Sequence, residues 1–186
     1  MKKILSFLGK YASGKNIVIL LFITLAIYSL MLFYTIPNIM IHSDGMELLD
    51  MQPTGYSAEY AKSLFENLGE KGREYYLFRQ IPVDMLYPLL FAITYSLLLI
   101  FLFRRAFSPV SKIHYFSLVP ILGGLFDYLE NFGIIFMLLI YPEFSNLLAQ
   151  TTNLFSIFKS GFTTIFFTLL FIALIALFIK RIKRSQ

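Results

Sequence analysis

The sequence predicts an all-α integral membrane protein: a four-transmembrane-helix bundle with an amphipathic outer interfacial helix. Of its 186 residues, 58% are apolar and 15% are charged, whereas an average soluble domain has about 45–50% and about 25%. Four apolar runs are long enough to cross a bilayer, and the basic residues gather on one side of them. We therefore expect one membrane domain over residues 1–186.

The four expected spans cover residues of about 16–36, 84–103, 114–140 and 154–180. A helix needs about 20 residues to cross a hydrocarbon core of about 30 Å. The first run follows Lys2 and Lys3, as the apolar part of a signal peptide would. It is too long for that and no small-x-small cleavage pattern follows, so we interpret it as a retained anchor.

The basic residues predict the orientation of the chain. Eleven of the 16 lie before the first span, between the second and third, or after the fourth, and these segments contain no acid. They are Lys2, Lys3, Lys10, Lys15, Arg104, Arg105, Lys112, Lys180, Arg181, Lys183 and Arg184. The positive-inside rule then predicts a multi-pass protein of the cell membrane with both termini cytoplasmic. Expected partners are membrane lipids, with anionic inner-leaflet lipid at the basic ends, and no nucleic acid. The Lys- and Ile-rich composition favours a bacterial plasma membrane.

The outer segment, residues 37–83, is too short to build an independent core. It should hold a helix over about 57–78, with Ser57 as the N-cap and Gly69 at a helix stop. We expect this helix to lie in the outer interface and cover the bundle, the alternative being a solvated connector. His42, Asp44, Glu47 and Asp50 lack metal-ligand spacing and resemble a solvated acidic loop. No metal or cofactor is expected.

The third span carries the polar residues that point to a site. Asp127, Glu130 and Asn131 fall on one helical face, together with Gly123 and Gly124. The opposite face is apolar. Small residues let neighbouring backbones approach, and carboxylates at this depth need partners or water. Asp127 and Glu130 form a hypothetical acid/base pair, because a protonated acid beside an ionised one can donate and accept a proton. The candidate ligand-binding residues beside this pair are Asn131, Gly123 and Gly124.

Further candidate ligand-binding residues come from the second and fourth spans. Asp84, Tyr87 and Tyr95 share one face of the second span. Lys159 of the fourth span reaches a depth similar to that of Asp84, so an ion pair between these two near the outer rim is one expectation. The alternative is that Lys159 extends alone to the outer surface.

Three functions remain open. The first is a buried carboxylate pocket, formed by Asp127, Glu130 and Asn131, that binds a lipid or apolar small molecule, with or without acid/base catalysis. In architecture alone, the predicted protein is similar to the EXPERA-type sterol isomerases and binding proteins, which bury carboxylates in a small helical bundle. The second is a structural or accessory subunit whose polar face docks another helix. The third is a small proton- or cation-coupled transporter. A homo-oligomer or a partner membrane protein is compatible with each.

Overall fold

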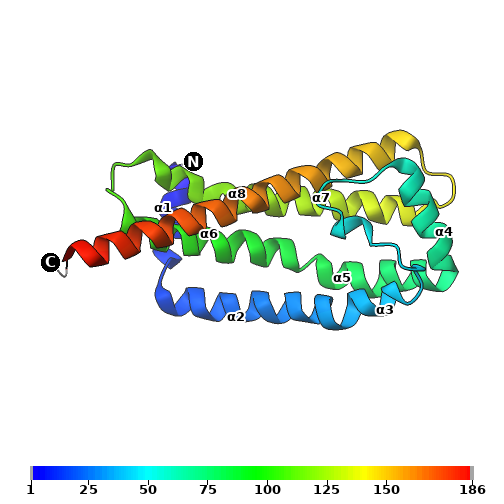
Figure 1. Cartoon of the computed structure of the whole chain (residues 1–186), viewed down its shortest axis with the longest axis horizontal. Coiled ribbons are helices and arrows are strands. Elements are labelled where there is room, and N and C mark those ends of the chain that lie inside the picture. Colours follow the sequence, from blue (N-terminus) through cyan, green and yellow to red (C-terminus); the bar gives the residue numbers. More distant parts are fainter. Residues whose placement is uncertain (1, 185–186) are drawn as a thin grey trace.

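A computed structural model describes residues 2–184, with the side chain of Arg184 outside the described part. The described residues are mostly helical and include no strand. Four helical stretches are long and apolar enough to cross a membrane: Gly14–Met40, Ala58–Ala106, Lys112–Leu139 and Asn146–Lys183. Most of their length runs up and down along the long axis of the molecule, while the first part of the second stretch crosses one end (Figure 1). The fold is therefore compatible with a multi-pass helical membrane protein.

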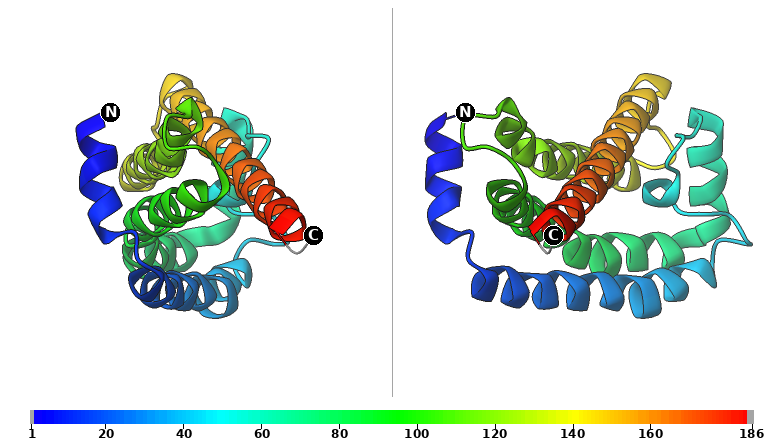
Figure 2. Two further views of the ribbon diagram at one scale, coloured as in Figure 1. Left: turned by 90° about the vertical axis from the view of Figure 1, so that its left-hand side faces the viewer. Right: turned by 60° about the vertical axis from the view of Figure 1, so that its left-hand side comes forward.

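The first stretch begins after a short separate helix. The helix α1 (Lys2–Tyr11) lies across one end of the bundle (Figure 2). Ser13 then caps α2 (Gly14–Leu30), because its hydroxyl accepts a hydrogen bond from the Asn16 backbone N–H. The helix continues through a π-helical turn, η1 (Met31–Thr35), into α3 (Ile36–Met40).

Two π-helical turns have the same local cause. Both η1 and η3 (Tyr76–Gln80) are followed directly by an Ile-Pro pair, Ile36-Pro37 in the first case and Ile81-Pro82 in the second. A proline ring clashes with the carbonyl four residues earlier, and a wider turn relieves the clash. The two turns meet in the structure, where Thr35 donates a hydrogen bond to Oε1 of Gln80.

The outer segment folds over one end of the bundle. It contains the 3-10 turn η2 (Leu49–Met51) and the helix α4 (Ala58–Tyr75), which continues through η3 into α5 (Ile81–Asp84). The predicted cap is confirmed, since Ser57 Oγ accepts a hydrogen bond from the Tyr60 N–H. The predicted break is confirmed as well, because Gly69 has φ of 60°. Helical structure nevertheless resumes after it, and Arg73 donates a 2.7 Å hydrogen bond to the Phe65 carbonyl.

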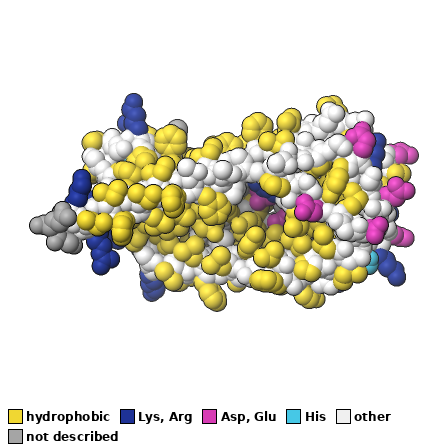
Figure 3. Space-filling view, viewed as in Figure 1, with side chains coloured by type: hydrophobic (Ala, Val, Ile, Leu, Met, Phe, Trp, Pro, Cys, Tyr) yellow, Lys and Arg dark blue, Asp and Glu magenta, His cyan; other side chains and the backbone are white. Residues whose placement is uncertain are grey.

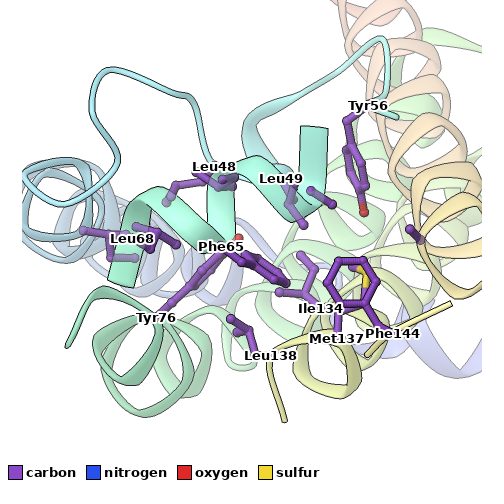
Figure 4. Packing of buried hydrophobic residues seen from close by; sticks show 14 of the residues in the cluster. Leu48, Leu49, Tyr56, Phe65, Leu68, Tyr76, Ile134, Met137, Leu138 and Phe144 are labelled. Atoms are coloured by element: carbon purple, nitrogen blue, oxygen red, sulfur yellow. The ribbon is translucent and has the colours of Figure 1, made fainter. Parts of the chain in front are cut away.

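A hydrophobic core joins this segment to the bundle (Figure 4). Leu48, Leu49 and Phe65 of the outer segment are fully buried against Ile134 and Met137 of the third long stretch. The outer segment therefore packs on the bundle, and the alternative of a solvated connector does not describe it.

The remaining helices are α6 (Tyr87–Ala106), η4 (Lys112–Leu118), α7 (Val119–Leu139) and α8 (Asn146–Arg184). Helix α8 begins eight residues before the predicted start of the fourth span, at 154. It lies against α7 at Gly133, where an added Cβ would collide with the Thr152 side chain. The missing side chain thus permits close approach of the two helices.

Charged side chains separate between the two ends of the molecule. Lys and Arg predominate at the end that holds the C-terminus, and Asp and Glu predominate at the opposite end (Figure 3). Two hydrogen bonds gather the basic segments: Arg104 donates to the Gly9 carbonyl at 2.6 Å, and Lys180 donates to the Arg105 carbonyl at 2.7 Å. On the face that Figure 3 shows, apolar side chains cover much of the middle of the molecule.

Candidate functional site

The polar face of α7 turns inward. Asp127, Glu130 and Asn131 are 7%, 0% and 1% exposed. On the opposite face, Leu125 and Phe136 are exposed. The sequence-based assignment of the two faces of this helix is therefore confirmed.

Helix α8 supplies the groups that pair with these carboxylates. The Lys159 ammonium forms an ion pair with Oε2 of Glu130 and lies 3.5 Å from Oδ1 of Asp127. Ser156, one turn earlier, donates a 2.6 Å hydrogen bond to the other Glu130 oxygen. The predicted ion pair between Lys159 and Asp84 is wrong, and so is the alternative of a lysine extending alone to the surface.

The early start of α8 explains this outcome. Because the helix begins at Asn146, Lys159 lies about 20 Å along it, at about 1.5 Å per residue. That depth is too great for its side chain to reach the end of the helix. A lysine far from both helix ends is stabilised when carboxylates surround it, and Asp127 and Glu130 occupy the same level.

The outer segment closes one side of this cluster through Asp50. Lys159 donates a 3.3 Å hydrogen bond to the Asp50 backbone carbonyl, and Tyr76 donates one of 2.6 Å to Oδ1 of Asp50. The prediction that Asp50 belongs to a solvated acidic loop is therefore wrong. The apolar pair Leu48-Leu49 next to it, which is buried, was the sequence signal that this part of the loop turns inward.

Tyr56 approaches the same cluster from the outer segment. Its N–H donates a 2.7 Å hydrogen bond to Oδ1 of Asn153, and the residue is 9% exposed. Burial raises the pKa of the Tyr56 phenol above its ordinary value, and the negative charge of Glu130 raises it further. Tyr56 therefore remains a neutral hydroxyl beside the carboxylates. Sequence reasoning missed it, because a lone tyrosine before a helix cap gives no signal of its partners.

The candidate residues of the second span separate into two groups. Asp84 is 4% exposed at the end of α5, where the charges of Asp127 and Lys159 act on it. Tyr95 instead packs in an aromatic cluster, with ring centroids 4.8 Å from Phe91 and 4.6 Å from Phe166. Tyr87 joins that cluster through Phe91 at 5.9 Å. The structure thus brings Asp84 toward the carboxylates and places the two tyrosines in aromatic packing.

Gly123 and Gly124 serve the packing of α7 on α6. A Cβ on Gly124 would lie 2.6 Å from the Pro88 carbonyl oxygen, whereas one on Gly123 would lie 3.3 Å from the Phe91 ring. The expectation that these small residues allow a close backbone approach is confirmed for Gly124.

Apart from Glu130, whose Oε2 lies in the ion pair, four buried side chains carry polar atoms without hydrogen-bond partners within the described residues: Gln80 and Ser96, and, next to Glu130, Tyr56 and Asn131. Neither amide atom of Asn131 has one, and neither does the Tyr56 hydroxyl. Most buried polar groups in proteins are paired, so such groups call for an explanation. Asn131 and Tyr56 belong to elements that contribute to the cluster, and both can bind a hydroxyl or carbonyl group.

The charges of the cluster do not balance. Lys159 is the cation, and it faces Asp127 and Glu130, while the charges of Asp50 and Asp84 also act on it. A surplus of buried carboxylates favours binding of protons or of a cationic or hydrogen-bond-donating group. Among residues 2–184, no group of three metal-ligating side chains comes together.

No protein-family model, curated protein or solved structure matches the chain. The fold and the site therefore define its class: an all-helical protein with four helices long and apolar enough to cross a membrane. Its candidate site is a lysine on α8 held between two carboxylates of α7.

Proposed function

We propose that the chain is a multi-pass membrane protein with four transmembrane helices and both termini in the cytoplasm, whose Asp127–Lys159–Glu130 cluster binds a lipid or other apolar molecule. We further propose that this membrane is the cell membrane of a bacterium. The separation of basic and acidic ends supports the orientation (Figure 3). The α4 helix then lies at the outer face.

The main support for the proposed site is that two oppositely charged side chains in a mostly apolar molecule are partly exposed. The side chains of Lys159 and Asp127 are 18% and 10% exposed, while that of Glu130 is fully buried. Charged groups in the hydrocarbon region are costly and are retained where they serve a site or a helix contact. We place the ligand against this partly exposed side of the pair.

The surroundings define the chemistry of the ligand. Phe126 of α7 packs on Phe158 and Phe162 of α8, with ring centroids 4.9 and 5.5 Å away. Apolar walls beside charged groups suit an amphipathic ligand whose polar end carries a hydroxyl or carbonyl. Lys159 and Asn131 supply donors, and Asp127 supplies an acceptor. Asp127 and Glu130 can also exchange a proton with the ligand, so acid/base catalysis is part of the proposal.

The test is gentle extraction of the full chain, followed by mass spectrometry of co-purified small molecules. A recurring bound lipid is expected in the native protein and is lost in Asp127→Asn and Glu130→Gln. Glu66→Gln, which changes an exposed acid on α4, is the matched control and should retain the lipid. Expression and helix content of the two site variants should stay near native.

The same experiment tests the structural alternative. If both site variants fail to insert or fold, the cluster serves to hold α7 on α8, as polar residues between membrane helices do. A stoichiometric partner protein in place of a lipid would assign the chain to an accessory subunit. A native protein that carries neither would remove the basis of the proposed lipid site.

Proton- or cation-coupled transport is the second candidate, favoured by the surplus of carboxylates around Lys159. In proteoliposomes, a coupled transporter would carry protons or monovalent cations down an imposed gradient, and Glu130→Gln would abolish that flux. Equal flux in the native protein and in Glu130→Gln would exclude this function for the cluster.

A further inference from the structure

A second candidate site lies at the opposite, basic end of the bundle. A cavity of about 250 Å³ opens there between α1, the end of α6 and η4. Its lining consists of Leu5, Ser6, Ile100, Arg104, Pro109 and His114. Drug-sized ligands occupy cavities of about 300–1,000 Å³, so this one suits a small group.

The polar side chains of the cavity match an anion. Arg104 contributes a guanidinium and Ser6 a hydroxyl. The His114 imidazole lines the wall and donates a 3.0 Å hydrogen bond from Nε2 to the Ser108 carbonyl. One guanidinium nitrogen of Arg104 donates to the Gly9 carbonyl, which fixes the side chain beside α1 and leaves further N–H groups. Residues 1–16 and 104–114 contain no acid that would oppose an anion. Arginine binds phosphate through its planar fork of donors.

The position of the cavity matches the phosphate layer of a membrane. Arg104 and Arg105 follow the apolar run of α6 directly, at the level where hydrocarbon ends. The adjacent helix α1 exposes Ile4 and Phe7 beside Lys2 and Lys3, the pattern of a helix lying in the interface. Ile100, 3% exposed, lines the cavity from the apolar side.

We propose that this cavity binds the phosphate of an anionic phospholipid headgroup, with Arg104 as its main ligand and the Ser6 hydroxyl as a second donor. The proposal rests on the membrane location proposed above and is independent of the carboxylate cluster. According to this proposal, the basic end binds lipid at a specific site and does not only attract anionic lipids through its surface charge.

The test is a calorimetric titration of the full, delipidated chain in neutral detergent. Short-chain phosphatidylglycerol should bind with one-to-one stoichiometry and more tightly than phosphatidylcholine of the same chain length. Arg104→Gln should weaken phosphatidylglycerol binding about tenfold or more, the size expected for a lost charge-assisted hydrogen bond. Lys183→Gln removes an exposed charge near the C-terminus, outside the cavity lining, and should leave binding within about twofold.

A second variant separates the cavity from the fold of α1. Ser6→Phe fills the cavity and keeps every charge, so it should also abolish the preference for phosphatidylglycerol, with unchanged helix content by circular dichroism. Displacement of the lipid by inorganic phosphate would assign the cavity to a free phosphate group, and lack of displacement assigns it to the lipid.

The proposal is overturned if phosphatidylglycerol binds no more tightly than phosphatidylcholine. It is equally overturned if Arg104→Gln and Lys183→Gln weaken binding alike, because surface charge then accounts for the effect. Asp127→Asn should bind phosphatidylglycerol as the native chain does. That comparison distinguishes a failure here from a failure of the proposed carboxylate site.

Discussion

Ser156 and Glu130 connect the two long helices at a point where both side chains are buried: Oγ of Ser156 donates a 2.6 Å hydrogen bond to Oε1 of Glu130. On the other Glu130 oxygen lies the Lys159 ammonium. One carboxylate of α7 therefore receives two groups from consecutive turns of α8.

Replacing the serine tests the first of these contacts. Ser156→Ala leaves Oε1 of Glu130 without its donor and should lower the free energy of unfolding by about 1–3 kcal/mol. Reversible unfolding in detergent measures the change. Thr151→Ala is the control, because its exposed hydroxyl bonds only within α8, to Leu147. It should stay within about 0.5 kcal/mol of the native chain, and an equal loss in both variants would contradict the assignment.

Removing the ammonium tests the ion pairs. Lys159→Met leaves two buried carboxylates without their cation and should destabilise the fold by about 3–5 kcal/mol. Adding Glu130→Gln removes one of the two charges, so the double variant should recover part of that loss. Thermal unfolding of the single and double variants in the same detergent gives the interaction free energy between Lys159 and Glu130. Additive losses would show that Lys159 and Glu130 do not interact.

The glycines of α7 provide a graded test of helix packing. Gly124→Ala places a methyl group 2.6 Å from a backbone oxygen of α6, which cannot move alone, so it should cost about 1–3 kcal/mol. Gly123→Ala meets a phenylalanine ring at 3.3 Å and should cost less. Gly161→Ala meets nothing within 4 Å and should stabilise α8 by about 0.5–1 kcal/mol. Melting temperatures that reverse this order would contradict the close approach of α6 and α7.

The bond between Tyr76 and Asp50 holds the outer segment over the cluster. Tyr76→Phe removes the donor and should speed amide hydrogen exchange at Met51 and Gln52 by about tenfold, because a hydrogen bond to a charged group is worth about 1.5–3 kcal/mol. Tyr75→Phe, on the neighbouring residue, should leave exchange in this stretch unchanged. Unchanged exchange in Tyr76→Phe would mean that Leu48 and Leu49 alone anchor the segment.

Local patterns in the sequence were enough to predict much of the fold. Apolar runs predicted the four long helices, and helical periodicity predicted which face of α7 carries Asp127, Glu130 and Asn131. Ser57 marked a helix start through its capping hydroxyl, and Gly69 marked a break through its backbone freedom. These features depend on residues within a few positions of one another, so they can be predicted from the sequence alone.

Only the tertiary structure decided which side chains meet. Lys159 pairs with Asp127 and Glu130 rather than Asp84, and Asp50 turns inward, because the depth and rotation of each helix relative to its neighbours bring these atoms together. The exact start of α8 sets the level of Lys159, and no periodicity along one helix encodes the offset of another. Contacts between Thr35 and Gln80 or between Gly133 and Thr152 arise in the same way, from packing of segments distant in the chain.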